Sequence, residues 1–142
     1  MRLHGAQVGG QLGCRGGSFE NKGGVALGCD LMRVTGSVFL DYDEEKKTGF
    51  QAHGEISLLG AEIGGQLGCR GGKLENKDGY ALSCDGMQVT GGVFLQNGFQ
   101  AQGEVRLLGA VIGGQLSCEG GKFENPGWYA LSCDRKQMTG SA

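Results

Sequence analysis

The chain has little that would support acid–base catalysis or a strongly charged partner. Its 142 residues include two histidines, one tryptophan and one proline, Pro126. The 13 basic and 15 acidic residues leave a formal net charge of -2, which gives no electrostatic reason to expect binding to nucleic acid. The same charge is too small to argue for a protein that imitates DNA. We therefore expect no nucleic-acid partner.

Long apolar runs are also missing. No stretch approaches the roughly 20 apolar residues of a transmembrane helix, so we expect no contact with a membrane. The first residues, MRLHGAQVGG, contain a positive charge but no apolar run behind it, so we expect no secretory signal peptide. Six cysteines would suit a secreted disulfide scaffold. Without a signal peptide, we expect a cytoplasmic location with reduced thiols.

Glycine, in contrast, is abundant, with 31 residues. Such a content can indicate disorder, but hydrophobic residues make up 39% of the chain and recur at regular intervals. Glycine reaches positive φ without steric cost, so these residues are suited to tight corners. The composition therefore favours a folded chain that bends often.

Internal repetition is the dominant pattern. Residues 60–91 match residues 109–140 at 22 of 32 positions, and residues 5–30 are a third copy. The middle repeat, 56–104, is 49 residues long. The first repeat, 1–55, is the same unit plus six residues around DYDEEKK, and the third, 105–142, is truncated. We interpret residues 1–142 as a single repeat domain.

Each repeat contains a finer pattern of alternating apolar residues. Alternation at i and i+2 is typical of strands, but here it lasts only about three residues before a glycine or polar break. No segment has the apolar stripe of a helix. The inward positions predicted for the middle repeat are Ile56, Leu58, Ala61, Ile63, Leu67, Cys69, Gly72, Leu74, Leu82, Cys84, Met87, Val89, Val93, Leu95, Phe99 and Ala101.

This spacing predicts an all-β fold: a parallel β-helix (solenoid), right-handed, with four short faces per coil. Two segments of 11 to 12 residues make one coil, so the chain forms five to six coils and the 49-residue repeat spans two. We expect the extra residues in ENKGGV, ENKDGY and ENPGWY to form outward bulges, and residues 41–47 to form a longer loop. No capping helix is expected at either end.

The steps Val105-x-Leu107, Ala110-x-Ile112, Leu116-x-Cys118 and Gly121-x-Phe123 resemble the pentapeptide-repeat family. The string GEVRLLGAVIGGQLSCEGGKF (103–123) also resembles repeats of uncharacterised bacterial proteins. The resemblance implies a right-handed quadrilateral coil. Because a residue is inserted at 113–115 and at equivalent sites, a triangular or irregular β-helix stays open as an alternative. Some members of the family are dimeric inhibitors of DNA gyrase.

The six cysteines form three pairs with one spacing, namely Cys14 and Cys29, Cys69 and Cys84, Cys118 and Cys133. A metal site or redox pair would be the functional interpretation, but zinc sites usually contain close C-x2-4-C pairs. Each cysteine instead falls in an inward position that leucine fills elsewhere, so we interpret them as core residues. We expect no metal site and no cofactor.

No catalytic constellation is predicted. The only histidines, His4 and His53, align with Leu59 and Gln102, and we place both on the solvated surface. Glu20, Glu75 and Glu124, each followed by asparagine, and Asp30, Asp85 and Asp134 could serve acid–base chemistry or calcium. We favour turn capping for them, since Asn and Asp bond readily to nearby backbone.

Two further surface features have alternative interpretations. Thr35, Thr90 and Thr139 would line up along the stack, but one threonine per two coils is sparse for ice binding. Trp128, Tyr129 and Tyr80 could form a binding patch. We favour instead that these aromatic side chains pack the bulge against the core.

These features favour a non-catalytic structural or protein-binding scaffold. The alternative is a macromolecular inhibitor or DNA mimic of the pentapeptide-repeat type that acts on a topoisomerase. An acyltransferase of the left-handed β-helix type would need a strict six-residue period, which is absent. The inward register starts at Met1 and runs to Met138, with Lys136 at an inward position. We therefore expect self-association, as a homodimer, through an uncapped end of the β-helix.

Overall fold

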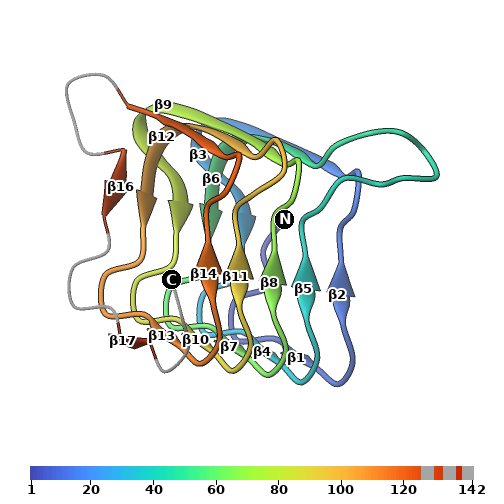
Figure 1. The fold of residues 1–142 in the computed structure, drawn as a ribbon, viewed down its shortest axis with the longest axis vertical. Helices are drawn as coiled ribbons and strands as arrows, with labels where there is room; N and C mark the ends of the chain where they lie inside the picture. Colours follow the sequence, from blue (N-terminus) through green and yellow to red (C-terminus); the bar gives the residue numbers. More distant parts are fainter. Residues whose placement is uncertain (126–129, 133–136, 139–142) are drawn as a thin grey trace.

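The protein is a parallel β-solenoid. The computed structural model describes residues 1–125, 130–132 and the backbone of 137–138. Within these residues the secondary structure is short β-strands, without a helix (Figure 1). The absence of helix confirms the prediction drawn from the alternating apolar pattern, and none of the described residues forms a helix that could cross a membrane.

The strands belong to three sheets in which every pair is parallel. Sheet A contains β3 (Ser18–Gly28), β6 (Gln51–Ser57), β9 (Lys73–Ser83), β12 (Gln100–Arg106) and β15 (Lys122–Glu124), with β16 (Leu131–Ser132) also paired to β12. Sheet B contains β1 (Gln7–Val8), β4 (Arg33–Val34), β7 (Glu62–Ile63), β10 (Gln88–Val89), β13 (Val111–Ile112) and β17 (Gln137–Met138). Sheet C contains β2 (Leu12–Gly13), β5 (Val38–Phe39), β8 (Leu67–Gly68), β11 (Val93–Phe94) and β14 (Leu116–Ser117).

The register of sheet B gives the length of each coil. Its paired residues are Gln7, Arg33, Glu62, Gln88 and Val111, so successive coils take 26, 29, 26 and 23 residues. The last two sum to 49, which is the length of the sequence repeat. Two coils per repeat and about five turns in all are therefore confirmed.

The path of the chain is right-handed in Figure 1. The strands of sheet C rise at the front, the chain crosses the top and descends at the rear, and each coil moves toward the C-terminal side. Each long strand of sheet A turns a corner near its middle and carries two of the four expected segments, such as Ala52 and Ile56 in β6. The coil thus has four apolar segments distributed over three sheets.

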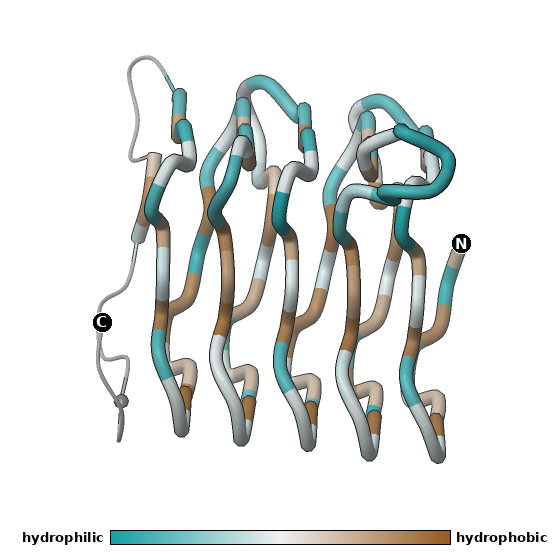
Figure 2. The backbone as a smooth tube through the Cα atoms, turned by 45° about the vertical axis from the view of Figure 1, so that its right-hand side comes forward, coloured by the Kyte–Doolittle hydropathy of each residue, from teal (hydrophilic) through white to brown (hydrophobic). Residues whose placement is uncertain are grey.

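The core is a set of vertical columns of apolar side chains. All fifteen side chains predicted to point inward in the middle repeat are exposed by 3% or less. In Figure 2 the apolar positions recur at matching heights in successive coils, whereas hydrophilic residues gather at the bulges and at the loop. Because apolar burial is the main favourable term in folding, these columns hold the coils together.

The bulges lie where they were expected. The strands β3 and β9 have 11 residues, whereas β6 and β12 have seven. The side-chain amide of Asn76 donates to the carbonyl O of Tyr80 at 2.8 Å and closes the bulge of β9. The next coil passes close beneath, because a Cβ atom at Gly103 would lie 2.5 Å from the carbonyl O of Asn76. Gly103, with φ of 122°, therefore permits a contact that a larger residue would block.

One corner of the coil has a left-handed backbone in each of the five turns in which the structure describes it. Gly5, Gly60, Gly86 and Gly109 adopt φ between 65° and 70° there. Leu31 occupies the same position in the second turn with φ of 59°, and 68% of its surface is exposed. A non-glycine residue in this region costs about 1–2 kcal/mol, so Leu31 is a strained position without a buried side chain to offset the strain.

We predict that Leu31→Gly raises the free energy of unfolding by up to about 1 kcal/mol, because it removes this strain at some entropic cost in the unfolded chain. Urea denaturation followed by circular dichroism measures the effect. Gly86→Ala is the matched control, since no heavy atom lies within 4 Å of a Cβ there, and should cost about 1 kcal/mol from φ alone. A loss of stability in Leu31→Gly would show that the leucine side chain is itself stabilising.

Candidate functional site

The cysteines lie in the core, as predicted for them. Cys29, Cys69 and Cys84 are exposed by 1% or less, and Cys14 and Cys118 are half-buried. Cys133 lies outside the described residues. In the coil-to-coil ladder Cys69 stacks between Leu40 and Leu95. Cysteine therefore alternates with leucine along the column.

The burial of these thiols changes their acidity. Desolvation raises the pKa of Cys29 to about 12, with the nearby Cys14 as a second cause. Desolvation also raises the pKa of Cys69 and of Cys84, and Cys69 contributes to the shift of Cys84. A thiol acts as a nucleophile or metal ligand in its thiolate form, so these groups are poorly suited to either role.

The histidines lie on the surface, each beside one carboxylate. The Nδ1 atom of His4 is 3.7 Å from Oδ2 of Asp30, and that of His53 is 3.7 Å from Oε2 of Glu75. In the part of the chain that the structure describes, no three His, Cys, Asp or Glu side chains converge as metal ligands.

The recurring asparagines bond to backbone four residues further on, whereas the recurring aspartates, which were expected to cap turns, bond to backbone of the next coil. Oδ1 of Asp30 accepts the amide of Leu59 at 3.1 Å, and Oδ1 of Asp85 accepts that of Leu108 at 3.0 Å. These bonds join one coil to the next rather than closing a turn within a coil. Asp134 lies outside the described residues.

One of the recurring glutamates, Glu75, has a contact other than the expected turn capping. Glu75 pairs with His53 instead of with backbone. The five residues in this row of sheet A are Glu20, His53, Glu75, Gln102 and Glu124. Lys73 and Lys122 precede two of the glutamates by two residues on the same outer face. The row of negative charge is therefore flanked by positive charge.

Tyr80 does not cover the core, which contradicts the expectation for it. Its side chain is 37% exposed and contacts Arg106, whose guanidinium carbon lies 4.9 Å from the ring centre. Trp128, Tyr129 and Thr139 lie outside the described residues. Thr35 and Thr90 are exposed and belong to alternate coils, as expected.

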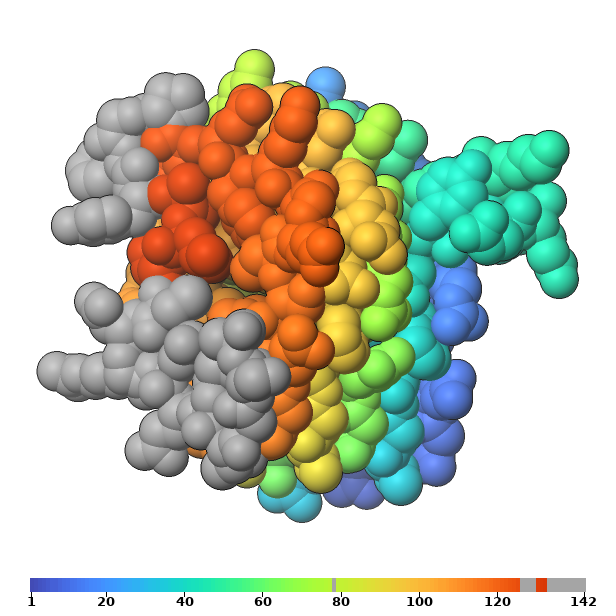
Figure 3. Space-filling view, in the orientation of Figure 1, coloured from blue at the N-terminus to red at the C-terminus, as the bar shows by residue number. Residues whose placement is uncertain are grey.

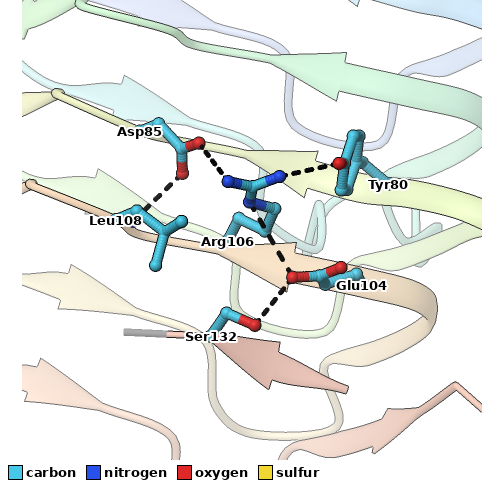
Figure 4. Close-up of polar contacts among 6 residues, drawn as sticks. All are labelled: Tyr80, Asp85, Glu104, Arg106, Leu108 and Ser132. Carbon is cyan, nitrogen blue, oxygen red and sulfur yellow. Dashed lines mark hydrogen bonds and ion pairs between the residues drawn. The ribbon is translucent and has the colours of Figure 1, made fainter. Parts of the chain in front are cut away.

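Arg106 lies at the centre of a polar cluster that spans three coils and that the sequence analysis missed (Figure 4). It donates from NH1 to the hydroxyl of Tyr80 at 2.7 Å, and its NH2 is 3.0 Å from Oδ2 of Asp85. Its Nε lies 3.8 Å from Oε2 of Glu104, which also accepts the hydroxyl of Ser132 at 2.7 Å. The signal was the break in the repeat, because Arg106 replaces Ser57 of the middle repeat.

Contacts between arginine and phenylalanine side chains also join neighbouring coils on the outer face of sheet C. The guanidinium of Arg15 lies 4.1 Å from the ring centre of Phe39, and that of Arg70 lies 4.4 Å from Phe94. Each arginine belongs to the coil before its phenylalanine, so these cation–π contacts also join neighbouring coils.

The hairpin, residues 41–48, is the one insertion that departs from the repeat. Asp43 and Thr48 exchange two backbone hydrogen bonds, and Oδ1 of Asp43 accepts the amides of Glu45 and Lys46. Asp41, which is 7% exposed, anchors its base by accepting the amide of Arg70 at 2.8 Å. The hairpin projects beyond the N-terminal side of the stack (Figure 3).

The first coil, residues 1–30, is the other feature that departs from the repeat. Its inward side chains as far as Phe19 are only partly buried, unlike the residues stacked on them in the second coil, whereas Ala26, Leu27 and Cys29 are buried. The partly buried side chains are Leu3, Ala6, Val8, Leu12, Cys14 and Phe19. Met1, expected in an inward position, is instead 64% exposed. The hairpin and strand β2 enclose an open hollow of about 510 Å³, lined by Gly13, Arg15, Tyr42, Asp43, Glu44 and Glu45.

Comparison of the chain with protein-family models, with curated proteins and with solved structures found no match. The proposed function is therefore inferred from the fold and from the geometry of the surface.

The acidity of the thiols leads to a prediction about pH. Folding raises the pKa of Cys29 above its ordinary value, so its contribution to stability is complete below about pH 9 and is lost as pH rises toward 12. Replacing Cys29 by alanine should reduce the alkaline loss of stability between pH 8 and 10, measured by urea denaturation at each pH. The control variant Cys14→Ala removes a half-buried thiol of the first coil, and it should change the dependence of stability on pH less. An equal slope in wild type and Cys29→Ala would contradict the prediction.

We also predict that Arg106→Ser lowers the free energy of unfolding by about 1 kcal/mol, a value reduced for partial exposure. Serine is the residue at the equivalent positions 57 and 83, so the backbone should tolerate it. The control is Arg33→Ser, which breaks the exposed pair with Glu62 and should cost less than about 0.5 kcal/mol. Equal losses in both variants would argue that the cluster has no special role.

Proposed function

We propose that the protein is a non-catalytic, cytoplasmic scaffold that binds other protein chains, including a second copy of itself, through an end of the solenoid. The observation that carries this proposal is the partly exposed core of the first coil. Apolar side chains at the end of a stack, beside unpaired strand edges, are normally covered by a cap or a partner. A second solenoid end offers the matching shape.

The arrangement of the polar residues supports a scaffold. The side chains that could have formed a reactive site are engaged between coils, as in the contacts of Arg106 with Asp85 and of Arg70 with Asp41. The buried thiols have raised pKa values. The contacts between coils add to the rigidity of the stack, and a rigid surface lowers the entropic cost of binding a partner.

We further propose a relationship to the pentapeptide-repeat type of coil. Its support is the four apolar segments per coil and the right-handed path. The topoisomerase-directed DNA mimic is less well supported. The glutamate row on sheet A is interrupted by His53 and Gln102 and has Lys73 and Lys122 beside it. A DNA mimic needs a continuous negative stripe, because its partner recognises the charge of phosphates.

The expected result for self-association is a mass near twice 14.8 kDa in light scattering at high micromolar concentration, with dissociation on dilution. Sedimentation equilibrium then gives the dissociation constant. Mass action requires the dimer fraction to fall with concentration, which separates a real equilibrium from aggregation. A monomeric mass over the whole range would refute this part of the proposal.

A further inference from the structure

The first coil and the hairpin carry opposite charge. With the N-terminal amine, Arg2, Arg15 and Lys22 against Glu20 and Asp30, the first coil has a formal charge of +4 − 2 = +2. The hairpin, residues 41–48, has four acidic and two basic residues, so its formal charge is −4 + 2 = −2. The hairpin extends past its own first coil, into the space that a chain docked on that coil would occupy (Figures 1 and 3).

The first coil also presents a strand edge to that space. The amides of Leu12 and Cys14 donate to carbonyls of the second coil at 2.9 and 2.8 Å. In a parallel ladder alternate residues bond to opposite sides, so the backbone groups of Gly13 face away from the second coil. Partly buried apolar side chains lie along this coil from Leu3 to Phe19, whereas Met1 and Leu3 already bond to Gly28 on the remaining side. An isolated peptide strand would cover only part of this surface, whereas a second solenoid end covers all of it.

From this geometry we infer that two copies of the chain dock head to head through their first coils, and that the hairpin of each copy clamps the first coil of the other. This inference rests on the proposed self-association and specifies its surface and its partner. It gives a closed, two-fold dimer, because each surface is used once by each copy.

The test uses two charge-reversed variants of the full chain. The hairpin variant carries Glu44→Lys and Glu45→Lys, which changes the hairpin from −2 to +2. The coil variant carries Arg2→Glu and Lys22→Glu, which changes the first coil from +2 to −2. Each variant alone should dimerise about tenfold more weakly than wild type, since both clamps become repulsive. Mixed one to one, they should form a heterodimer of near wild-type affinity, because both clamps are again complementary.

Native mass spectrometry of differently labelled variants measures homodimer and heterodimer together, and circular dichroism checks that each variant is folded. The control variant, Glu119→Lys with Glu124→Lys, should dimerise like wild type. Gly13→Pro removes an amide N–H that faces away from the second coil, and should also weaken the dimer. No heavy atom lies within 4 Å of a Cβ at this position, so a side chain has room there.

Three results would overturn the inference. If wild type dimerises but the mixture shows no preference for the heterodimer, the clamp is wrong while self-association stands. The same holds if the Glu119 and Glu124 control, and not the hairpin variant, weakens the dimer. If wild type is monomeric at every concentration, the proposed self-association fails together with the clamp.

Discussion

The stacking of each coil directly on the one before it is the constraint on which the structure depends. Strands in a parallel sheet lie about 4.8 Å apart, so each residue sits above its counterpart in the previous coil. A column position must then be apolar in every coil if it points inward, and must allow the same backbone angles if it forms a corner. The column of Gly5, Gly60, Gly86 and Gly109, with φ from 65° to 70°, shows how closely one corner is repeated.

This constraint also determines what the polar residues do. A side chain on a coil has its nearest neighbours on the coils above and below, which explains why the bonds of Asp30, Asp85 and Arg106 cross from coil to coil. Groups used in this way stabilise the stack, and they are no longer free to act on a substrate. Distinct properties are then found where the repetition is broken, in the hairpin and in the first coil.

Much of the fold could be predicted because the residues that point into the core are apolar and recur at a regular spacing in the sequence. The residues from Ile56 to Ala101 alternate with a period that suits only short strands, and the 49-residue repeat gave two coils. The three-sheet arrangement could not be predicted, because a strand that bends around a corner has the same pattern as two short strands. The Arg106 cluster was missed because it combines residues 80, 85 and 104, which only the register brings together. The predicted inward position of Met1 was wrong, because the periodicity of the sequence does not show whether another coil covers the first residue of a column.

The repeat spans two coils rather than one because neighbouring coils compensate for one another. The bulge closed by Asn76 requires Gly103 in the next coil, where a side chain would meet its carbonyl oxygen. Likewise the small Cys69 lies between the larger Leu40 and Leu95, so volume lost in one layer is returned in the next. A single coil would have to stack on its own copy, bulge on bulge and cysteine on cysteine, with clashes outside and cavities inside. The pair of coils is therefore the smallest unit that can be repeated without strain.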